Sequence, residues 1–330
     1  TKYKVAFPLD ADFNYNGTSC PGIPLPGETP WRTITVGENL KPIVETTIAL
    51  HKVFNSPKDK IIFDVSHQCY PHKILTGRKK AFENPLQNAE ITGYSNPKEC
   101  KHDHFVIGHT STSVSLATGV AKARDLNKEK YNVIVIIGDG SLSGGEAFEG
   151  FNNAAELNSN IIIIVNDNEM SIAENHGGIY KNLKELRDSN GTSQNNIFKA
   201  MGFEYYYEDK GNDTNKLIKI FEKVKDTKKP TIVHIHTLKG KGFKPAEKDK
   251  EKYHWIMPGF LDENKTISRE KEENYYNITT DYIINKKDEK IMVVTPATPG
   301  ATGLTPEIRE KLGKQYSDVG IAEEHAVAYI

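Results

Sequence analysis

The sequence predicts an α/β fold, a doubly wound and mostly parallel sheet with helices on both of its faces. Short runs of β-branched residues recur between helical segments, which is typical of parallel strands buried on both sides. Polar clusters follow these runs, at the position where parallel sheets bind their ligands. At 330 residues the chain is also long enough for one large α/β domain or two smaller ones.

The expected elements follow one another in order along the chain. Apolar residues at helical spacing predict a helix over 43–54, and further helices are expected to end at Ala123 and to span 145–157. A last helix is expected within 265–285, after a polar connection. The tyrosines at 205–207 are attributed to packing. The strands are expected at 60–65, 104–107, 132–137, 160–165, 230–236 and 290–297.

Composition divides the chain into four segments. Residues 1–34 contain several prolines and predict an irregular N-terminal arm. Residues 35–264 hold most of the strand and helix pattern and are expected to form the main α/β domain. The polar segment 265–288 is expected to be a linker, and 289–330 to begin a second α/β unit. The pattern at Ile330 is helical and has no C-cap signal, which indicates a fragment or a split subunit.

Charge, hydropathy and cysteine content argue against several classes of protein. The formal net charge is −1 and the pI is near 6.8, so no global basic field favours nucleic-acid binding. No apolar run is long enough for a membrane span, and no export signal is expected. The cysteines Cys20, Cys69 and Cys100 are odd in number and far apart. This argues against a disulfide framework and suits a reducing cytoplasm.

Two polar turns about thirty residues apart predict a metal site. Asp139 follows the strand expected at 132–137, and Asn168 follows the strand expected at 160–165. Because a helix connects these strands, we expect them to be adjacent and parallel, with both side chains at one edge of the sheet. A carboxylate and an amide oxygen suit Mg²⁺, which prefers oxygen ligands and keeps waters or phosphates in its shell. The sequence therefore predicts a divalent cation that holds a phosphate group.

The same turns resemble a cofactor fingerprint. The motifs GDG at 138–140 and NDN at 166–168 together resemble the thiamine diphosphate motif of transketolase-like enzymes. Flanking segments are similar to the family of 1-deoxy-D-xylulose 5-phosphate synthases, in family order over about 40–330. These segments are FDVSHQCYPHKILTGR (63–78), GHTSTSVSLATGVAKARD (108–125), NDNEMSIAEN (166–175), KGKGFKPAE (239–247) and DVGIAEEHAV (318–327). The resemblance implies the thiamine diphosphate-binding fold, with 35–264 as its diphosphate-binding domain and 289–330 as the start of an incomplete pyrimidine-binding domain.

The resemblance also implies roles for the residues at the strand ends. Asp139, Asn168 and the backbone carbonyl of Met170 would bind Mg²⁺, and the segment 239–244 would cover the diphosphate. The helix expected from Gly145 could direct the positive end of its dipole at the anion. The residues expected to contact the cofactor are His67, His109, Thr110, Ser111, Gly138, Gly140, Ser141, Asn168, Ser171, Ile172 and Lys244.

The reaction that the resemblance implies is that of a transferase dependent on thiamine diphosphate and Mg²⁺. It condenses pyruvate, with decarboxylation, and D-glyceraldehyde 3-phosphate to 1-deoxy-D-xylulose 5-phosphate, a precursor for isoprenoid, thiamine and pyridoxal biosynthesis. The implied catalytic residues are Glu323, His67 and His254. Glu323 would hydrogen-bond the aminopyrimidine ring, and its neighbour Glu324 is the alternative. Because relatives are dimers, a cytoplasmic homodimer that binds these small-molecule substrates is expected.

One segment departs from the family. Relatives have a GGHLG-like loop that supplies a histidine to the active site, whereas 35–45 reads TVGENLKPIVE and contains no histidine. Two other functions therefore stay open, the N-terminal subunit of a split transketolase and a non-catalytic diphosphate-binding module. The histidine pairs His102/His104 and His234/His236 alternate at strand spacing but have no partner cluster, so zinc binding is not predicted.

Overall fold

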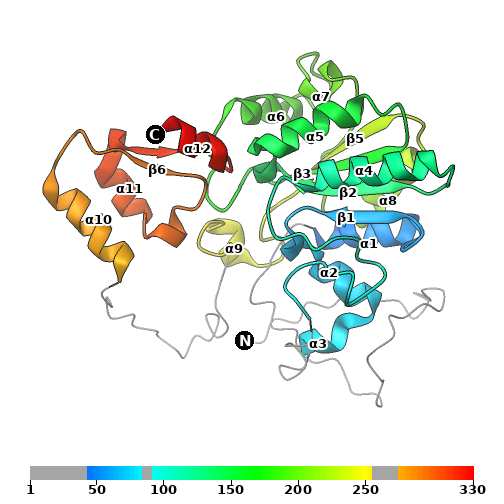
Figure 1. Ribbon diagram of the computed structural model, residues 1–330, viewed down its shortest axis with the longest axis horizontal. Helices are drawn as coiled ribbons and strands as arrows, with labels where there is room; N and C mark the ends of the chain where they lie inside the picture. The colour runs from blue at the N-terminus through cyan, green and yellow to red at the C-terminus, as the bar shows by residue number, and fades with distance from the viewer. Residues whose placement is uncertain (1–42, 84–90, 255–273) are drawn as a thin grey trace.

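The computed structural model describes residues 43–83, 91–254 and 274–330 (Figure 1). Within these ranges the chain forms a five-stranded parallel sheet, covered by helices on both faces, and a separate two-stranded parallel sheet. The expected α/β class is confirmed. The arm expected at 1–34 lies outside the described residues, and so does the first part of the expected linker.

The large sheet has the strand order β1-β2-β3-β5-β4, and every neighbouring pair in it is parallel. Parallel neighbours require crossover connections, which are usually helices packed on a face of the sheet. The strands are β1 (Lys60–Phe63), β2 (Val133–Gly138), β3 (Ile161–Asp167), β4 (Glu204–Glu208) and β5 (Pro230–His236). In the small sheet, β6 (Val293–Thr295) pairs with β7 (Tyr316–Asp318).

The helices vary in length from single turns to 14 residues in α4. Their bounds are α1 Val44–Val53, α2 Tyr70–Lys73, α3 Lys79–Glu83, α4 Ser113–Leu126, α5 Gly145–Ala155, α6 Gly178–Asp188, α7 Ile197–Ala200, α8 Thr214–Val224, α9 Lys244–Lys248, α10 Tyr275–Lys286, α11 Pro306–Leu312 and α12 Glu323–Tyr329. Short 3-10 or π-helical turns are η1 Ser66–Cys69, η2 Ile74–Arg78, η4 Asp139–Ser143, η5 Gly300–Thr302 and η6 Gly313–Gln315.

Both faces of the large sheet are buried, as the alternation along β2 demonstrates. Val133, Val135 and Ile137 pack in the core layer that contains α4 and α5. Ile134 and Ile136 point the other way, into the layer formed with α1 and α8. All five side chains are fully buried. Burial of one such side chain contributes about 1.5–3 kcal/mol, so both faces favour apolar residues and the strand is a continuous apolar run.

Most expected elements are present with small shifts, but one expected strand is wrong and one strand was not predicted. The segment 104–107 is not a strand. Ile107 is buried and Val106 is 68% exposed, so this apolar run belongs to a loop that packs against the core. Tyr205 and Tyr206 pack against the core, as expected of the tyrosines at 205–207, but this segment also forms the middle of the unpredicted strand β4. β4 lies at the edge of the sheet and its side chains are only half-buried, so its sequence lacks the pattern of a central strand.

The cysteines differ in state. Cys69 is a free, buried thiol, and burial raises its pKa to about 12. Cys100 is disulfide-bonded, so the expectation against disulfides is wrong at this position. None of the described helices is long and apolar enough to cross a membrane.

Candidate active site

The two polar turns predicted to share a ligand are neighbours at the carboxyl edge of the sheet. β2 and β3 pair in parallel, and the last pair in their register joins Gly138 to Asn166. Asp139 begins the turn η4 directly after this pair. The turns also approach closely, since a Cβ added at Gly140 would lie 3.0 Å from the Cβ of Ser171. The expected adjacency of the two strands is therefore confirmed, and a side chain at position 140 would press closely on Ser171.

Asp139 is a buried carboxylate that forms no ion pair among the described residues. Its Oδ2 accepts a 2.7 Å hydrogen bond from Asn175 Nδ2. Burial, reinforced by the negative charge of Asp167, raises the pKa of Asp139 to about 8. A bound cation would stabilise the charged carboxylate of Asp139 and so oppose the effects of burial and of the Asp167 charge on its pKa.

Unused oxygen atoms lie on the second turn and on the segment that follows it. Asn168 Oδ1, Asn175 Oδ1 and Ser171 Oγ are buried and have no hydrogen-bond partner in the part of the chain that the structure describes. Buried polar atoms are almost always satisfied, so these oxygens point to a missing ligand. The described residues contain no cluster of three or more His, Cys, Asp or Glu side chains suited to a metal. One carboxylate with amide and carbonyl oxygens fits a hard cation that takes its remaining ligands from phosphate or water.

The three residues of the NDN motif have different partners. Asn166 Oδ1 accepts a 2.7 Å hydrogen bond from Thr237 Oγ1. Asp167 is fully buried, and its carboxylate accepts from His234 Nε2 at 2.9 Å and from Arg187 at 2.5 Å. Burial alone would raise the pKa of Asp167, but the hydrogen bond from His234 and the charge of Arg187 outweigh it and hold this pKa below its ordinary value. Asn168 is the one member of the motif whose side-chain oxygen is unused among the described residues.

The loop of the GHTSTS motif is tied to the first turn by Ser111. Ser111 Oγ donates a 2.8 Å hydrogen bond to the backbone carbonyl of Ser141. The backbone amides of Ser111 and Ser113 donate to the two carboxylate oxygens of Asp64, at 3.0 and 3.1 Å. Asp64 is fully buried, and desolvation raises its pKa. It was not among the predicted site residues, although its place near the end of the strand predicted at 60–65 could have suggested it.

Two predicted residues from distant parts of the chain lie together at the edge of this site. His109 Nε2 is 3.9 Å from Glu323 Oε1, and their side chains are 65% and 45% exposed. The hydrogen bond to the Thr110 carbonyl, followed by the charge of Glu323, raises the pKa of His109. The segment before α12 is held in place by a hydrogen bond from Ser143 Oγ to the Ile321 carbonyl at 3.1 Å.

The remaining predicted contacts belong to several separate segments of the chain. Met170 and Ile172 are half-buried, and Met170 forms an isolated bridge with Glu174. Lys244 is exposed at the start of α9, and His254 is half-buried at the end of a described range. Only the backbone of His67 is described, in η1, so the predicted role of its side chain falls outside the described part of the chain.

Lys239 begins the segment 239–244 that the resemblance places over the diphosphate. It is buried, and its Nζ donates a 2.5 Å hydrogen bond to the backbone carbonyl of Ser171. Burial lowers the pKa of Lys239 to about 8, an effect that the charge of Asp139 partly offsets. An amine this close to the two turns supplies positive charge for a phosphate ligand.

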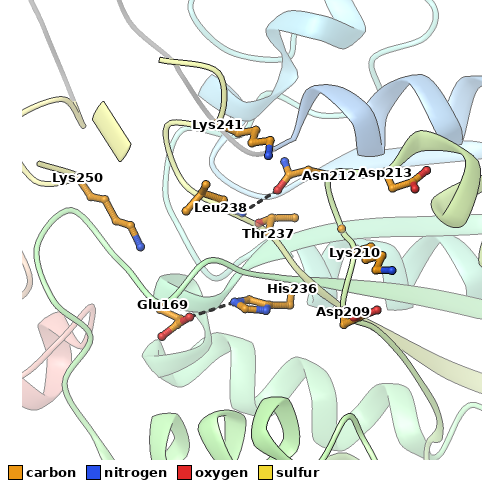
Figure 2. A pocket seen from close by; sticks show the side chains of 11 residues that line it. Glu169, Asp209, Lys210, Asn212, Asp213, His236, Thr237, Leu238, Lys241 and Lys250 are labelled. Atoms are coloured by element: carbon orange, nitrogen blue, oxygen red, sulfur yellow. Dashed lines mark hydrogen bonds and ion pairs between the residues drawn. The ribbon is translucent and has the colours of Figure 1, made fainter. Parts of the chain in front are cut away.

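A cavity of about 420 Å³ lies beside the second turn (Figure 2). Glu169, the neighbour of Asn168, forms part of its wall, and so does Lys241, from the segment 239–244 expected to cover the diphosphate. The other lining residues are Asp209, Lys210, Gly211, Asn212, Asp213, His236, Thr237, Leu238 and Lys250. The cavity therefore adjoins the turn that carries Asn168 without enclosing the candidate metal site.

Comparison with known sequences places the chain in a family. A family model described as 1-deoxy-D-xylulose-5-phosphate synthase matches residues 35–196 and 190–237, which include both turns. The chain belongs to this family. The resemblance found in the motifs is thereby confirmed.

Individual relatives show how much of such a protein this chain represents. The 1-deoxy-D-xylulose-5-phosphate synthase of Alkaliphilus oremlandii is 38% identical over 87% of this chain and 52% of its own length. The protein of the same name from Listeria monocytogenes is 42% identical over 88% of this chain and 49% of its own length. The chain spans about half the length of the curated relatives it matches. Among solved structures, transketolase from Leishmania mexicana matches 56% of this chain and 29% of its own, with a TM-score of 0.45 and 20% identity.

Proposed function

We propose that this chain forms the diphosphate-binding part of a 1-deoxy-D-xylulose-5-phosphate synthase that depends on thiamine diphosphate and Mg²⁺. In that reaction pyruvate loses CO₂, and its two remaining carbons are joined to D-glyceraldehyde 3-phosphate to give 1-deoxy-D-xylulose 5-phosphate. The observation that carries the proposal is the pairing of a buried Asp139 with an unused Asn168 oxygen on neighbouring strand ends, in a chain of this family. A homodimer, a cytoplasmic location and a role in isoprenoid and thiamine biosynthesis are part of the same proposal.

The residues of the two turns would bind the metal and the diphosphate. Asp139, Asn168 and the Met170 carbonyl would hold Mg²⁺, and Asp139 would supply the negative charge. The positive charge of Lys239, which is buried next to Ser171, would offset the negative charge of the diphosphate. The remaining predicted contacts would orient the cofactor; they are His67, His109, Thr110, Ser111, Gly138, Gly140, Ser141, Ser171, Ile172 and Lys244.

Glu323 would hydrogen-bond the aminopyrimidine ring, and His67 and His254 would act near the substrate. Thiamine diphosphate, when bound, supplies the carbanion chemistry that amino-acid side chains lack. The position of Glu323 beside His109 supports its choice over Glu324, which forms no ion pair in the described ranges. By the same reasoning 35–264 is the diphosphate-binding domain and 289–330 begins the pyrimidine-binding domain, with 265–288 between them.

Calorimetry on the 330-residue chain tests the binding part of this proposal. Thiamine diphosphate should bind in the presence of Mg²⁺, and Asp139→Asn should lower its affinity at least 10-fold because a charged metal ligand is removed. Glu149→Gln is the control, since Glu149 is exposed on α5. Equal affinity for the unmodified chain with and without Mg²⁺ would refute the metal site.

The reaction itself is tested by adding the half of the relatives that this chain does not match. The chain is assayed with a polypeptide equivalent to the second half of its relatives, and product is measured from pyruvate and D-glyceraldehyde 3-phosphate. Product that requires a ketose phosphate donor in place of pyruvate would favour the split transketolase. Binding without turnover would favour the non-catalytic module, which the absence of a histidine in 35–45 also favours.

A further inference from the structure

Helix α6 contacts both of the turns that carry the candidate metal ligands. The hydroxyl of Tyr180 lies 3.2 Å from the carbonyl oxygen of Asp139 and 3.3 Å from that of Gly140, and donates to them on the first turn. Seven positions later on α6, Arg187 donates through NH1 to Asp167 on the second turn. Seven residues are nearly two turns of an α-helix, so Tyr180 and Arg187 lie on the same face. One rigid helix therefore spans the two turns.

Arg187 holds the residues on both sides of Asn168. Its NH1 is 2.5 Å from Asp167 Oδ2, and its NH2 is 3.4 Å from Glu169 Oε2. The other oxygen of Glu169 accepts from His236 Nε2 at 3.0 Å, the bond drawn in Figure 2. Glu169 also has a φ of 66°, a left-handed backbone that a non-glycine residue adopts only when its surroundings hold it there.

The side chain of Asp167 receives further support from the neighbouring strands. His234 Nε2 donates to the same Oδ2 at 2.9 Å, and His234 Nδ1 is 2.8 Å from the hydroxyl of Tyr205 on β4. Because Nε2 carries the proton toward the carboxylate, Nδ1 accepts from the Tyr205 hydroxyl. None of these bonds uses Asn168 Oδ1, so the network fixes the turn and leaves that oxygen for a ligand.

We propose that α6 is a spacing brace, in which Tyr180 and Arg187 are positioning residues that set the separation of Asp139 and Asn168. The inference rests on the proposed metal site and adds its selectivity. Mg²⁺ demands near-octahedral oxygen ligands at about 2.0–2.1 Å, whereas Ca²⁺ accepts irregular shells at about 2.3–2.6 Å. A fixed separation of the two turns therefore favours Mg²⁺, and a loosened separation admits Ca²⁺ more easily.

The test compares Mg²⁺ and Ca²⁺ affinities in variants of α6, by calorimetry on the 330-residue chain with saturating thiamine diphosphate. Arg187→Lys keeps a positive charge near Asp167 but lacks the fork that reaches both carboxylates. Tyr180→Phe removes only the hydroxyl. Each change should lower Mg²⁺ affinity about 10-fold, as substitutions of residues that support metal ligands do, while Ca²⁺ affinity changes by less than about threefold. Lys184→Gln is the matched control, because Lys184 lies on the same helix, is 65% exposed and pairs only with Asp188 among the described residues.

The outcomes separate the brace from a purely structural role and from failure of the site itself. If both variants leave the ratio of Mg²⁺ to Ca²⁺ affinity unchanged, the spacing role of α6 is refuted and the metal site stands. If the unmodified chain binds no Mg²⁺, the proposed function and this inference fail together. Thermal unfolding without metal identifies a variant that does not fold; should Arg187→Lys be one, the affinity ratio of Tyr180→Phe decides.

Discussion

Replacing Gly144 by alanine should disrupt the contact that joins two loops of the candidate site. A Cβ at this position would lie 2.1 Å from Ser111 Oγ and 2.5 Å from Ser111 Cβ, far inside van der Waals contact. The φ of Gly144 is −70°, so its backbone conformation is open to any residue. Only the space taken by Ser111 excludes a side chain.

The expected loss of stability has two parts. Overpacking at a buried position costs about 1–3 kcal/mol. Displacement of the Ser111 side chain also breaks its 2.8 Å hydrogen bond to the Ser141 carbonyl, which contributes about 0.5–1.5 kcal/mol. We therefore expect Gly144→Ala to lower the free energy of unfolding by about 2–4 kcal/mol.

Urea denaturation of a double-mutant cycle measures this effect. Ser111→Gly should rescue Gly144→Ala, because it removes the clashing atoms and because the φ of 73° at Ser111 favours glycine. The coupling energy between the two positions should be about 1.5–3 kcal/mol. Gly145→Ala is the control, since a Cβ there meets no atom within 4 Å, and it should change stability by less than about 0.5 kcal/mol. Additive effects in the double variant would refute the reasoning.

Two further predictions concern buried charges. Because burial raises the pKa of Asp139 to about 8, the metal-free folded protein holds a proton that the unfolded chain has lost above about pH 4. The free energy of unfolding should then fall by up to about 1.4 kcal/mol per pH unit as the pH rises toward 8. Urea titrations at pH 6 and 8 should show this pH dependence for the unmodified chain and not for Asp139→Asn. An equal pH dependence in the two proteins would contradict the raised pKa of Asp139. Arg78→Met should lower the free energy of unfolding by about 3–5 kcal/mol, because the buried carboxylate of Asp103 loses its bidentate hydrogen bonds from the Arg78 guanidinium. A loss below about 1 kcal/mol in the same assay would show that other partners suffice.

The parallel sheet was predictable because its cause is local. A strand such as β3 is buried on both faces, so every position from Ile161 to Val165 is aliphatic and the run is visible without a structure. The same logic predicted that Asp139 and Asn168 leave adjacent strands. It failed at β4, where Tyr205 and its neighbours are half-buried at the edge of the sheet. It failed again at 104–107, where burial of Ile107 arises from a loop.

The candidate site was only partly predictable, because its supporting contacts join segments remote in sequence. Motif likeness selected Asp139 and Asn168, but nothing in the NDN motif indicates that Asp167 turns away to meet His234 and Arg187. Likewise Asp64, which accepts from two backbone amides 47 and 49 positions later, has no sequence signal beyond its place after a strand.

By itself, then, the sequence determined the α/β class, the family and the pair of turns that carry the candidate ligands. Strand periodicity and short motifs are properties of neighbouring residues, and neighbouring residues are what a sequence displays. Only the tertiary structure decided which polar atoms of those turns are already satisfied and which are unused. Hydrogen bonds such as that from Tyr180 to Asp139, 41 positions apart, depend on where a helix packs. It is this packing that leaves the Asn168 oxygen unused and sets it on the strand end next to that of Asp139.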